Sequence, residues 1–306
     1  MAADREKAPQ PPVLVIGRTG QIAASLRAIS DDEMPFLCLG RREGLDITDA
    51  DSLRVVLDGC RPDLVVNAAA YTSVDRAEAE PDAAFAVNAQ GPATLARLCA
   101  ERDIPIIHLS TDYVFDGMKG EPYVEDDLIS PVNTYGASKA AGETALRDIT
   151  HRYVILRTSW LYSPFGTNFM KTMLRLAQTR EEISVVADQR GCPTAAHDVA
   201  AAIRTIAFQL REGGGTFGVF HLAGAEAATW FDFANGIVDL AGAGVDRRLR
   251  ILPIATAEYR AAALRPPDSR LGCGKVAGAY GLALPSWRKS LERVLAQPLA
   301  DMETKG

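Results

Sequence analysis

The chain contains 306 residues, of which 47% are hydrophobic and 24% are charged, and its formal net charge is -6 at pH 7. This composition is typical of a globular protein with a sizeable buried core, and the acidic balance argues against nucleic acid or an anionic membrane as the main partner. An anionic small ligand would therefore need a locally basic pocket. The five cysteines include no C-x-x-C pair, which argues against a disulfide framework or a zinc site and favours a reducing cytoplasm.

The first segment, residues 1–11, is polar and contains prolines, and we expect it to be a disordered lead-in. It has no apolar run of the signal-peptide type, and no window of the chain approaches ~18 uninterrupted apolar residues. The sequence therefore predicts a soluble cytoplasmic protein with no membrane partner.

From residue 12 onwards, short apolar runs alternate with longer amphipathic stretches. We predict strands at residues 13–17, 36–40, 64–69, 105–110 and 153–158, and helices at residues 20–29, 49–59, 83–101 and 135–148. This alternation is typical of a parallel sheet covered by helices. The predicted fold class is α/β, with a Rossmann-type doubly wound parallel sheet, and residues 12–160 are expected to form a dinucleotide-binding domain.

The regular alternation of predicted strands and helices ends after residue 160. Here we predict helices at residues 168–178, 198–211, 230–242 and 286–296 and strands at residues 183–187 and 218–224. A glycine-rich turn at 213–215 and a proline-bearing break at 265–271 interrupt them. Residues 161–306 are expected to form a smaller, mainly substrate-binding part, with some segments returning to the first domain.

The turn after the first strand reads VLVIGRTGQIAASL, with Gly17 at the strand end and Gly20 at the start of the helix. Backbone N–H groups and the helix dipole can face a phosphate there. Ala23 replaces the third glycine of the dinucleotide fingerprint and is small enough for the close contact of helix and strand. Taken alone, the motif is equally consistent with a tight turn that binds nothing.

The second strand ends in LGRRE, which places Arg41 and Arg42 where NAD-binding folds often carry a carboxylate. Two guanidinium groups suit the 2′-phosphate of NADPH. We therefore expect NADPH as the cofactor, with NADH as the second option. The alternative is that both are ordinary surface arginines.

The segment PVNTYGASKAAGETAL places Tyr135 and Lys139 four residues apart on a predicted helix, where they share a face. They form either a proton-transfer pair or simply two polar residues of one helical turn. Glu143 lies one turn further on and could compete for Lys139, but Lys-before-Glu is the weaker orientation. We expect Lys139 to point towards the cofactor ribose instead.

Several separated motifs occur in order along the chain: GRTGQIA, VVNAAAYTSVDRAE, HLSTDYVFDG, SPVNTYGASKAAGE and ILRTSWLY. With these motifs the chain resembles the extended short-chain dehydrogenase/reductase superfamily, and within it the dTDP-4-dehydrorhamnose reductase family. The resemblance continues through NFMKTMLRLA, VVADQRGCPT, FHLAGAEAATWFDFA and RPPDSRL, from Val13 to about Leu295. It implies an NADPH-dependent oxidoreductase of dTDP-rhamnose biosynthesis that reduces the C4 ketone of dTDP-4-dehydro-L-rhamnose to dTDP-L-rhamnose.

The resemblance also implies three catalytic roles, and each has a physical reason. Tyr135 would be the general acid that protonates the alkoxide formed by hydride transfer. Lys139 would stabilise the phenolate electrostatically and reach the nicotinamide ribose. Thr111, at the end of the fourth strand, would hydrogen-bond the substrate carbonyl oxygen.

Binding residues follow from the same resemblance. Those expected at the cofactor are Gly17, Thr19, Gly20, Gln21, Ile22, Arg41, Arg42, Asp46, Ile47, Ala69, Ala70, Tyr71, Thr72, Tyr135 and Lys139. Those expected at the substrate are Thr111, Asp112, Tyr113, Trp160, Arg265 and Arg270, with the two arginines at the diphosphate. Asn88 is a further polar candidate. The alternatives are structural: Thr111 as a cap, Asp112 as the brace of a turn, and Tyr113 or Trp160 as core.

The substrate and the assembly remain open at this point. Another nucleotide-linked 4-keto-6-deoxysugar, giving for example 6-deoxy-L-talose, would use the same three catalytic residues, and a non-catalytic regulatory subunit could share the fold. Some members of the family pair through a metal held by acidic side chains, whereas TAAHDV and SWRKSL place His197 and Arg288 here. We expect no metal and a monomer or weak homodimer. His108 and His221 are expected to be satisfied core residues.

Overall fold

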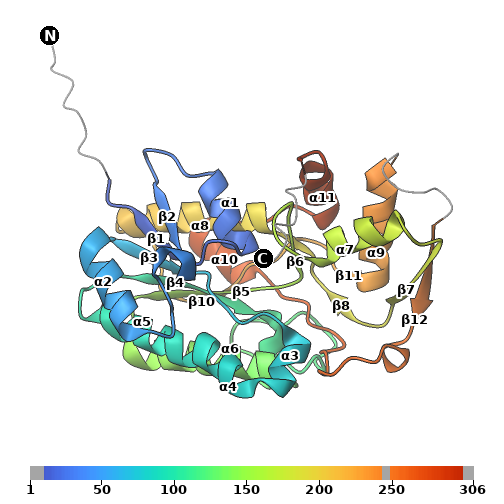
Figure 1. The fold of residues 1–306 in the computed structure, drawn as a ribbon, viewed down its shortest axis with the longest axis horizontal. Helices are drawn as coiled ribbons and strands as arrows, with labels where there is room; N and C mark the ends of the chain where they lie inside the picture. Colours follow the sequence, from blue (N-terminus) through green and yellow to red (C-terminus); the bar gives the residue numbers. More distant parts are fainter. Residues whose placement is uncertain (1–9, 243–248, 299–306) are drawn as a thin grey trace, which may run out of the picture.

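The computed structural model describes residues 10–242 and 249–298. Its centre is a parallel six-stranded sheet in the order β10-β5-β4-β3-β1-β2 (Figure 1). The strands are β1 (Val13–Ile16), β2 (Phe36–Leu39), β3 (Leu64–Asn67), β4 (Ile106–Thr111), β5 (Tyr153–Thr158) and β10 (Gly218–His221). The predicted fold class is confirmed. The predicted lead-in at residues 1–11 falls largely outside the described residues.

Aliphatic side chains on both faces of the strands explain why the sheet lies at the centre. All four residues of β1 and of β3 are buried. Fully burying one Val, Leu or Ile side chain stabilises a protein by about 1.5–3 kcal/mol, so runs of this kind favour a sheet covered on both faces.

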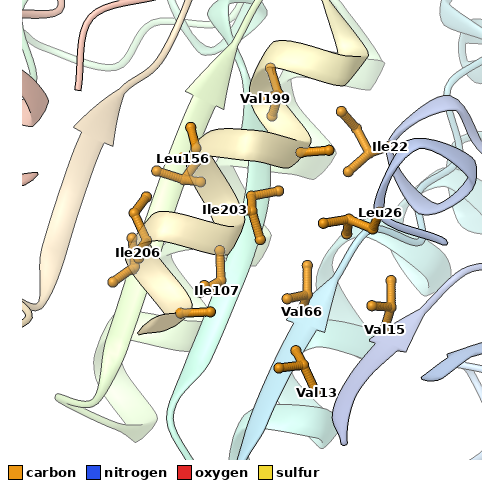
Figure 2. Packing of buried hydrophobic residues seen from close by; sticks show 14 of the residues in the cluster. Val13, Val15, Ile22, Leu26, Val66, Ile107, Leu156, Val199, Ile203 and Ile206 are labelled. Atoms are coloured by element: carbon orange, nitrogen blue, oxygen red, sulfur yellow. The ribbon is translucent and has the colours of Figure 1, made fainter. Parts of the chain in front are cut away.

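Helices cover both faces of this sheet. One face carries α1 (Gln21–Ala28), α8 (Ala196–Arg211) and α10 (Gly274–Tyr280). Figure 2 shows Val199, Ile203 and Ile206 of α8 beside Leu156 and Ile107 of the sheet. The opposite face carries α2 (Ala50–Cys60), α5 (Gly91–Ala100) and α6 (Thr134–Ile149). The last of these helices bears the predicted Tyr–Lys pair.

The predicted helix at residues 83–101 is interrupted rather than regular. It consists of α4 (Pro81–Phe85), a π-helical stretch (Ala86–Gln90) and α5. Pro92 has no N–H to donate to the carbonyl of Asn88, so the regular ladder cannot continue across this point. The sequence prediction also missed α3 (Val74–Ala79) and α10.

The second half of the chain builds a smaller lobe beside the sheet (Figure 1). Its helices are α7 (Phe169–Ala177), α9 (Trp230–Ala241) and α11 (Trp287–Leu295). Three short two-stranded sheets accompany them: β6 (Leu161–Tyr162) with β9 (Thr194–Ala195), β8 (Arg190–Gly191) with β11 (Ala228–Thr229), and β7 (Glu182–Val186) with β12 (Arg250–Ile254). Of these six strands only β7 was predicted from the sequence; β6, β8, β9, β11 and β12 were missed.

Two further expectations can be compared with the structure. All five cysteines, for which no disulfide framework was expected, are free thiols in this structure. Within the described residues, no helix combines the length and the apolar character needed to cross a membrane.

Candidate active site

Most of the predicted site residues follow the carboxyl ends of neighbouring parallel strands. The glycine turn follows β1, the Ala69–Thr72 segment follows β3, and Thr111 is the last residue of β4. Thr111 lies in register with Thr158, the last residue of β5. Because parallel strands end at one edge, the sheet topology brings these segments together in the crevice where open α/β sheets bind ligands.

The glycine turn has the backbone of a phosphate-binding turn. Gly17 has φ +120°, and a Cβ there would meet the backbone of Ala68 at 3.4 Å. Gly20 caps the start of α1, and a Cβ there would meet nothing within 4 Å, so ligand atoms can approach this backbone. The residues present therefore fit a bound pyrophosphate.

The side chain of Gln21 ties the turn to the second half of the chain. Its Oε1 accepts hydrogen bonds from Ser163 at 2.8 Å and from Asn168 at 3.0 Å. Its Nε2 donates to the carbonyl of Leu161 at 3.3 Å. The predicted cofactor residue Gln21 thus holds the loop before α7 against the start of α1.

The arginines after β2 are accompanied by carboxylates. Arg41 forms an ion pair with Asp46 at 2.8 Å while remaining 70% exposed. Arg18, which the sequence reasoning did not select, pairs with Glu43 at 3.2 Å. Glu43 also accepts a hydrogen bond from the Gly40 N–H. The region expected at the 2′-phosphate therefore carries both signs of charge, and the guanidinium groups are close to the surface.

Asn88 connects the segment after β3 to helix α6. Its Oδ1 accepts from the Tyr71 N–H at 2.8 Å, and its Nδ2 donates to the Tyr71 carbonyl at 3.0 Å and to Ser138 at 2.9 Å. The Tyr71 phenol turns away to donate to Glu80. The structure thus gives Asn88 a role in shaping the backbone of this segment.

The position of Tyr135 depends on a close contact between the backbone of α6 and the loop after β4. Asn133 caps α6 by accepting from the Gly136 N–H, and any Cβ on Gly136 would overlap the carbonyl of Tyr113. Helix α6 can therefore begin directly against the loop after β4. As a result, the rings of Tyr113 and Tyr135 meet edge to face at 6.0 Å.

Desolvation of the Tyr135 hydroxyl keeps the phenol protonated. Desolvation raises its pKa to about 12, and the neighbouring Thr111 side chain opposes that shift by hydrogen bonding. Thr111 also accepts from the Tyr113 N–H at 3.2 Å and donates to Asp112 at 3.1 Å. Its predicted alternative role as a cap is confirmed, and the same hydroxyl lies beside the phenol.

Lys139 is 2% exposed, and its Nζ donates to the Leu109 carbonyl at 2.6 Å. Burial lowers its pKa to about 8, and the negative charge of Glu143 acts in the opposite direction. Glu143 is itself held by Arg157 at 2.7 Å and by Ser110. Glu143 thus has Arg157 as its ion-pair partner, and the expected contact of Lys139 with the cofactor ribose stays a prediction.

Asp112 is a buried acid next to the predicted catalytic residues. It is 2% exposed, and desolvation raises its pKa to about 7. Thr111 and Ser269 both donate hydrogen bonds to its carboxyl group. Ser269 was missed because it lies 157 residues away in sequence, in a segment that reads only as a break.

The remaining predicted substrate residues already have partners. Arg265 forms a two-pronged pair with Asp75 at 2.7 and 2.8 Å, and Arg270 pairs with Asp268 at 2.6 Å. Trp160 has a positive φ of 46° and stacks on Trp230 with ring centroids 3.6 Å apart. The two arginines are thus neutralised locally, and the tryptophan belongs to an aromatic stack.

One buried hydroxyl at this edge was not selected from the sequence. Among the described residues, the Thr158 Oγ1 atom is buried and has no hydrogen-bond partner. Buried polar atoms are nearly always satisfied, so an unsatisfied hydroxyl beside Thr111 fits a place where a ligand atom binds.

Comparison with known proteins gives consistent results. The sequence profile of one family, described as the RmlD substrate binding domain, matches residues 12–299. The dTDP-4-dehydrorhamnose reductase of Sinorhizobium fredii is 43% identical over 283 residues, which are 92% of this chain and 95% of that protein. The dTDP-4-keto-6-deoxy-D-glucose reductase of Streptomyces niveus is 41% identical over 264 residues, 85% of this chain and 88% of that protein.

A solved structure extends the likeness to three dimensions. The crystal structure of dTDP-4-dehydrorhamnose reductase from Bacillus anthracis in complex with NADP superposes with a TM-score of 0.87 at 36% identity. The match covers 93% of this chain and 98% of that one.

Proposed function

This chain belongs to the dTDP-4-dehydrorhamnose reductase family of oxidoreductases, and we propose that it reduces the C4 ketone of dTDP-4-dehydro-L-rhamnose with NADPH to give dTDP-L-rhamnose. The observation that carries the proposal is the position of the Tyr135 phenol beside the Thr111 hydroxyl at the carboxyl end of β4, with Lys139 one helical turn further along α6 and a dinucleotide-type glycine turn after β1. Their chemistry is that of a carbonyl reductase. We further propose that residues 12–160 hold the cofactor and residues 161–306 mainly hold the sugar nucleotide.

Each residue of the set has a defined task in this proposal. Bound NADPH supplies a hydride, with its two electrons, to the carbonyl carbon. Tyr135 donates its phenolic proton to the carbonyl oxygen as that oxygen becomes an alkoxide, so the products are the alcohol and NADP⁺. Thr111 lies beside the phenol and stabilises the developing charge on the oxygen. Lys139, one helical turn away, stabilises the Tyr135 phenolate electrostatically.

The cofactor and the anionic substrate both need positive charge from this acidic protein. Arg41 and Arg42 follow β2, and Arg18 lies beside them through its pair with Glu43. We propose that these residues bind the 2′-phosphate, and that Arg265 and Arg270 exchange their carboxylate partners for the substrate diphosphate. The Bacillus anthracis relative was solved with NADP, which supports NADPH over NADH. The free cysteines support a cytoplasmic location.

The direct test is reduction of the enzymatically prepared 4-keto sugar by the purified protein. Cofactor absorbance should fall with NADPH, the product should be dTDP-L-rhamnose, and kcat/KM should be higher with NADPH than with NADH. Failure to oxidise either cofactor would reject the proposed reaction, and a clear preference for NADH would reject the assignment of the arginines.

A second substrate is favoured by one specific observation. The Streptomyces niveus relative, at 41% identity, is named for a different dTDP-linked 4-keto-6-deoxysugar. The same three catalytic residues would serve that ketone, or the opposite hydride face that leads to 6-deoxy-L-talose. Product stereochemistry determined by NMR distinguishes these outcomes, because cofactor consumption is the same for all of them.

A further inference from the structure

Asn67 and His108 form a buried polar pair, and His108 lies next to Lys139. The reaction proposed above uses neither Asn67 nor His108. Asn67 is 1% exposed and His108 is 0% exposed. They lie on adjacent strands, β3 and β4, directly opposite each other in the register. The expectation that His108 is a satisfied core residue is confirmed, but its partners give it a specific chemical state.

The direction of each hydrogen bond can be assigned from the donors. The Ala69 N–H can only donate, and it donates to Asn67 Oδ1 at 3.2 Å. This fixes the amide, so Asn67 Nδ2 faces His108 Nδ1 at 3.0 Å as a donor. His108 Nδ1 must then be the acceptor. A neutral imidazole carries one proton, so that proton is on Nε2.

The Nε2–H of His108 faces the amine of Lys139, with the two nitrogens 3.5 Å apart. An ammonium group has only donors, so it meets another N–H at this position, whereas a neutral amine offers a lone pair. Burial favours the same pair of states: desolvation and Lys139 hold the pKa of His108 well below its usual value, and desolvation lowers that of Lys139.

We propose that Asn67 and His108 act as positioning residues that fix the Nε2–H tautomer of His108 and thereby favour the neutral amine of Lys139. The consequence for turnover rests on the proposed function. After Tyr135 has given up its proton, the Lys139 ammonium can return one to the phenolate and become the neutral amine, which accepts from His108. Lys139 then takes up one proton from the solvent, and this is the single proton that each turnover consumes.

The other charged groups around Lys139 do not cancel the influence of His108 on its protonation state. Glu143 on the same helix favours the ammonium, but Arg157 of β5 and Ser110 of β4 engage that carboxylate. Asp112, from the loop after β4, acts on Tyr135. Glu143 and Asp112 thus each have other partners, and the side chain of β4 that faces the Lys139 amine is His108, through its Nε2 atom.

The tautomer can be measured in the free protein by ¹⁵N NMR of histidine-labelled samples, with His108→Gln used to assign the signal. We expect a neutral Nε2–H ring from about pH 5 to about pH 8, the range in which unperturbed histidines change their charge. In Asn67→Asp the carboxylate accepts from both Ala69 N–H and the ring, so the proton should move to Nδ1. A wild-type Nδ1–H or charged ring, or an unchanged tautomer in Asn67→Asp, overturns the proposal.

The pH profile of kcat/KM tests the effect on Lys139. The wild-type basic limb is expected near pH 8, following the lysine. His108→Leu removes the opposing N–H, and Asn67→Asp turns a lone pair towards the ammonium, so both should move this limb upwards by about one unit. His108→Gln can accept from Asn67 and donate to Lys139, and it should keep the limb in place.

The variants also separate a ring-mediated effect from simple charge or misfolding. Adding Asn67→Asp to His108→Leu should produce little further shift, because no ring remains to transmit the change. A basic limb that stays in place in both single variants, or a His108→Gln limb that moves as far as that of His108→Leu, overturns the role assigned to the pair. The NMR result is independent of substrate, so a failure of the proposed reaction leaves that test intact.

Discussion

Tyr135 illustrates how desolvation of one hydroxyl decides the role of a single residue. A phenol whose pKa is raised to about 12 holds its proton throughout the physiological range. It can therefore act as an acid only when a strongly basic alkoxide forms beside it. The close contact of helix α6 with the loop after β4 provides that position, and the hydroxyl of Thr111 moderates the shift.

Replacing Tyr135 with Phe removes the proton and little else. We expect kcat for ketone reduction to fall by about 10²–10⁴-fold, which is the usual contribution of a general acid. The dissociation constant for NADPH, measured by fluorescence titration, should stay within about two-fold, because binding relies on backbone groups and arginines. Tyr153→Phe is the matched control, since Tyr153 begins β5 at the opposite edge of the sheet. Unimpaired turnover in Tyr135→Phe would disprove the general-acid role.

Asp112 makes stability depend on pH in an unusual direction. Its pKa is raised from 3.8 to about 7 in the folded protein. Between these values the folded state binds a proton that the unfolded state has released, so the free energy of unfolding falls as pH rises. In Asp112→Asn this loss should disappear. From urea unfolding at pH 5 and pH 8, we expect the wild type to lose about 2 kcal/mol relative to the variant.

A neighbouring carboxylate provides the control for this measurement. Hydrogen bonds from Tyr123 and from a backbone N–H hold the pKa of Asp116 below 3.8. That group is ionised in both states over the tested range, so Asp116→Asn should leave the pH dependence of stability as in the wild type. Parallel curves for the wild type and Asp112→Asn would show that Asp112 is ionised in the folded protein.

At the scale of elements, the strands of the central sheet could be predicted because each contains a short run of mainly apolar residues, and those of β1 and β3 are buried throughout. The prediction at residues 153–158 matches β5, whose side chains are almost all buried. The helix α3 was missed since its sequence, VDRAEA, has only one buried residue and no apolar face. Pairing of Arg265 with Asp75 could not be predicted, because nothing local connects residues 190 positions apart.

The site shows the same division between local and distant information. The Tyr135–Lys139 spacing and the glycine turn are local patterns, so the sequence contains them. The partners of Lys139 are instead contributed by β4, and those of Asp112 include Ser269 from the second half of the chain. The chemical states of the predicted residues thus depend on packing that the sequence alone does not display.

Helix α6 depends on small residues to reach its position. A Cβ on Gly142 would overlap the carbonyl of Asn88 in the π-helical stretch, where main-chain atoms cannot give way easily. Gly142→Ala should therefore destabilise the protein by about 1–3 kcal/mol, despite the higher helix propensity of alanine. The measurement is the urea midpoint at constant m value.

Gly59 in α2 is the control, since a Cβ there would meet nothing within 4 Å. Gly59→Ala should raise stability by about 0.5–1 kcal/mol through the lower entropy of the unfolded chain. If both alanine variants change stability in the same direction, the close packing of α6 against Asn88 is not the reason for glycine at position 142.

At the scale of the whole molecule, the segment before α10 connects the two halves of the site. Asp75 of α3 accepts from the N–H groups of Ala262 and Ala263 and pairs with Arg265. Asn133, the cap of α6, donates to the carbonyl of Leu264. One chain segment is thus held by two helices of the sheet domain, and this arrangement links the predicted diphosphate residues to the position of Tyr135.

The assembly of the protein is a further property of the whole molecule. In the TAAHDV segment, Asp198 is 7% exposed and its carboxylate accepts hydrogen bonds from Ser290 and from Arg293, the latter at 2.7 Å. Arg288 lies over the ring of Trp287 at 4.2 Å. Within residues 10–242 and 249–298 there is no group of three or more His, Cys, Asp or Glu side chains that could hold a metal ion.

We therefore expect sedimentation velocity to give a mass near the 32.9 kDa of one chain, with at most weak dimerisation as concentration rises. The profile should be the same in millimolar MgCl₂ and in EDTA, because the carboxylate of Asp198 already forms an ion pair with Arg293 of the same chain. Arg293→Ala provides the contrast: it frees that carboxylate and so should leave the mass unchanged in EDTA while allowing magnesium to act. A stable dimer of the wild type that forms only with magnesium would contradict this account of the surface.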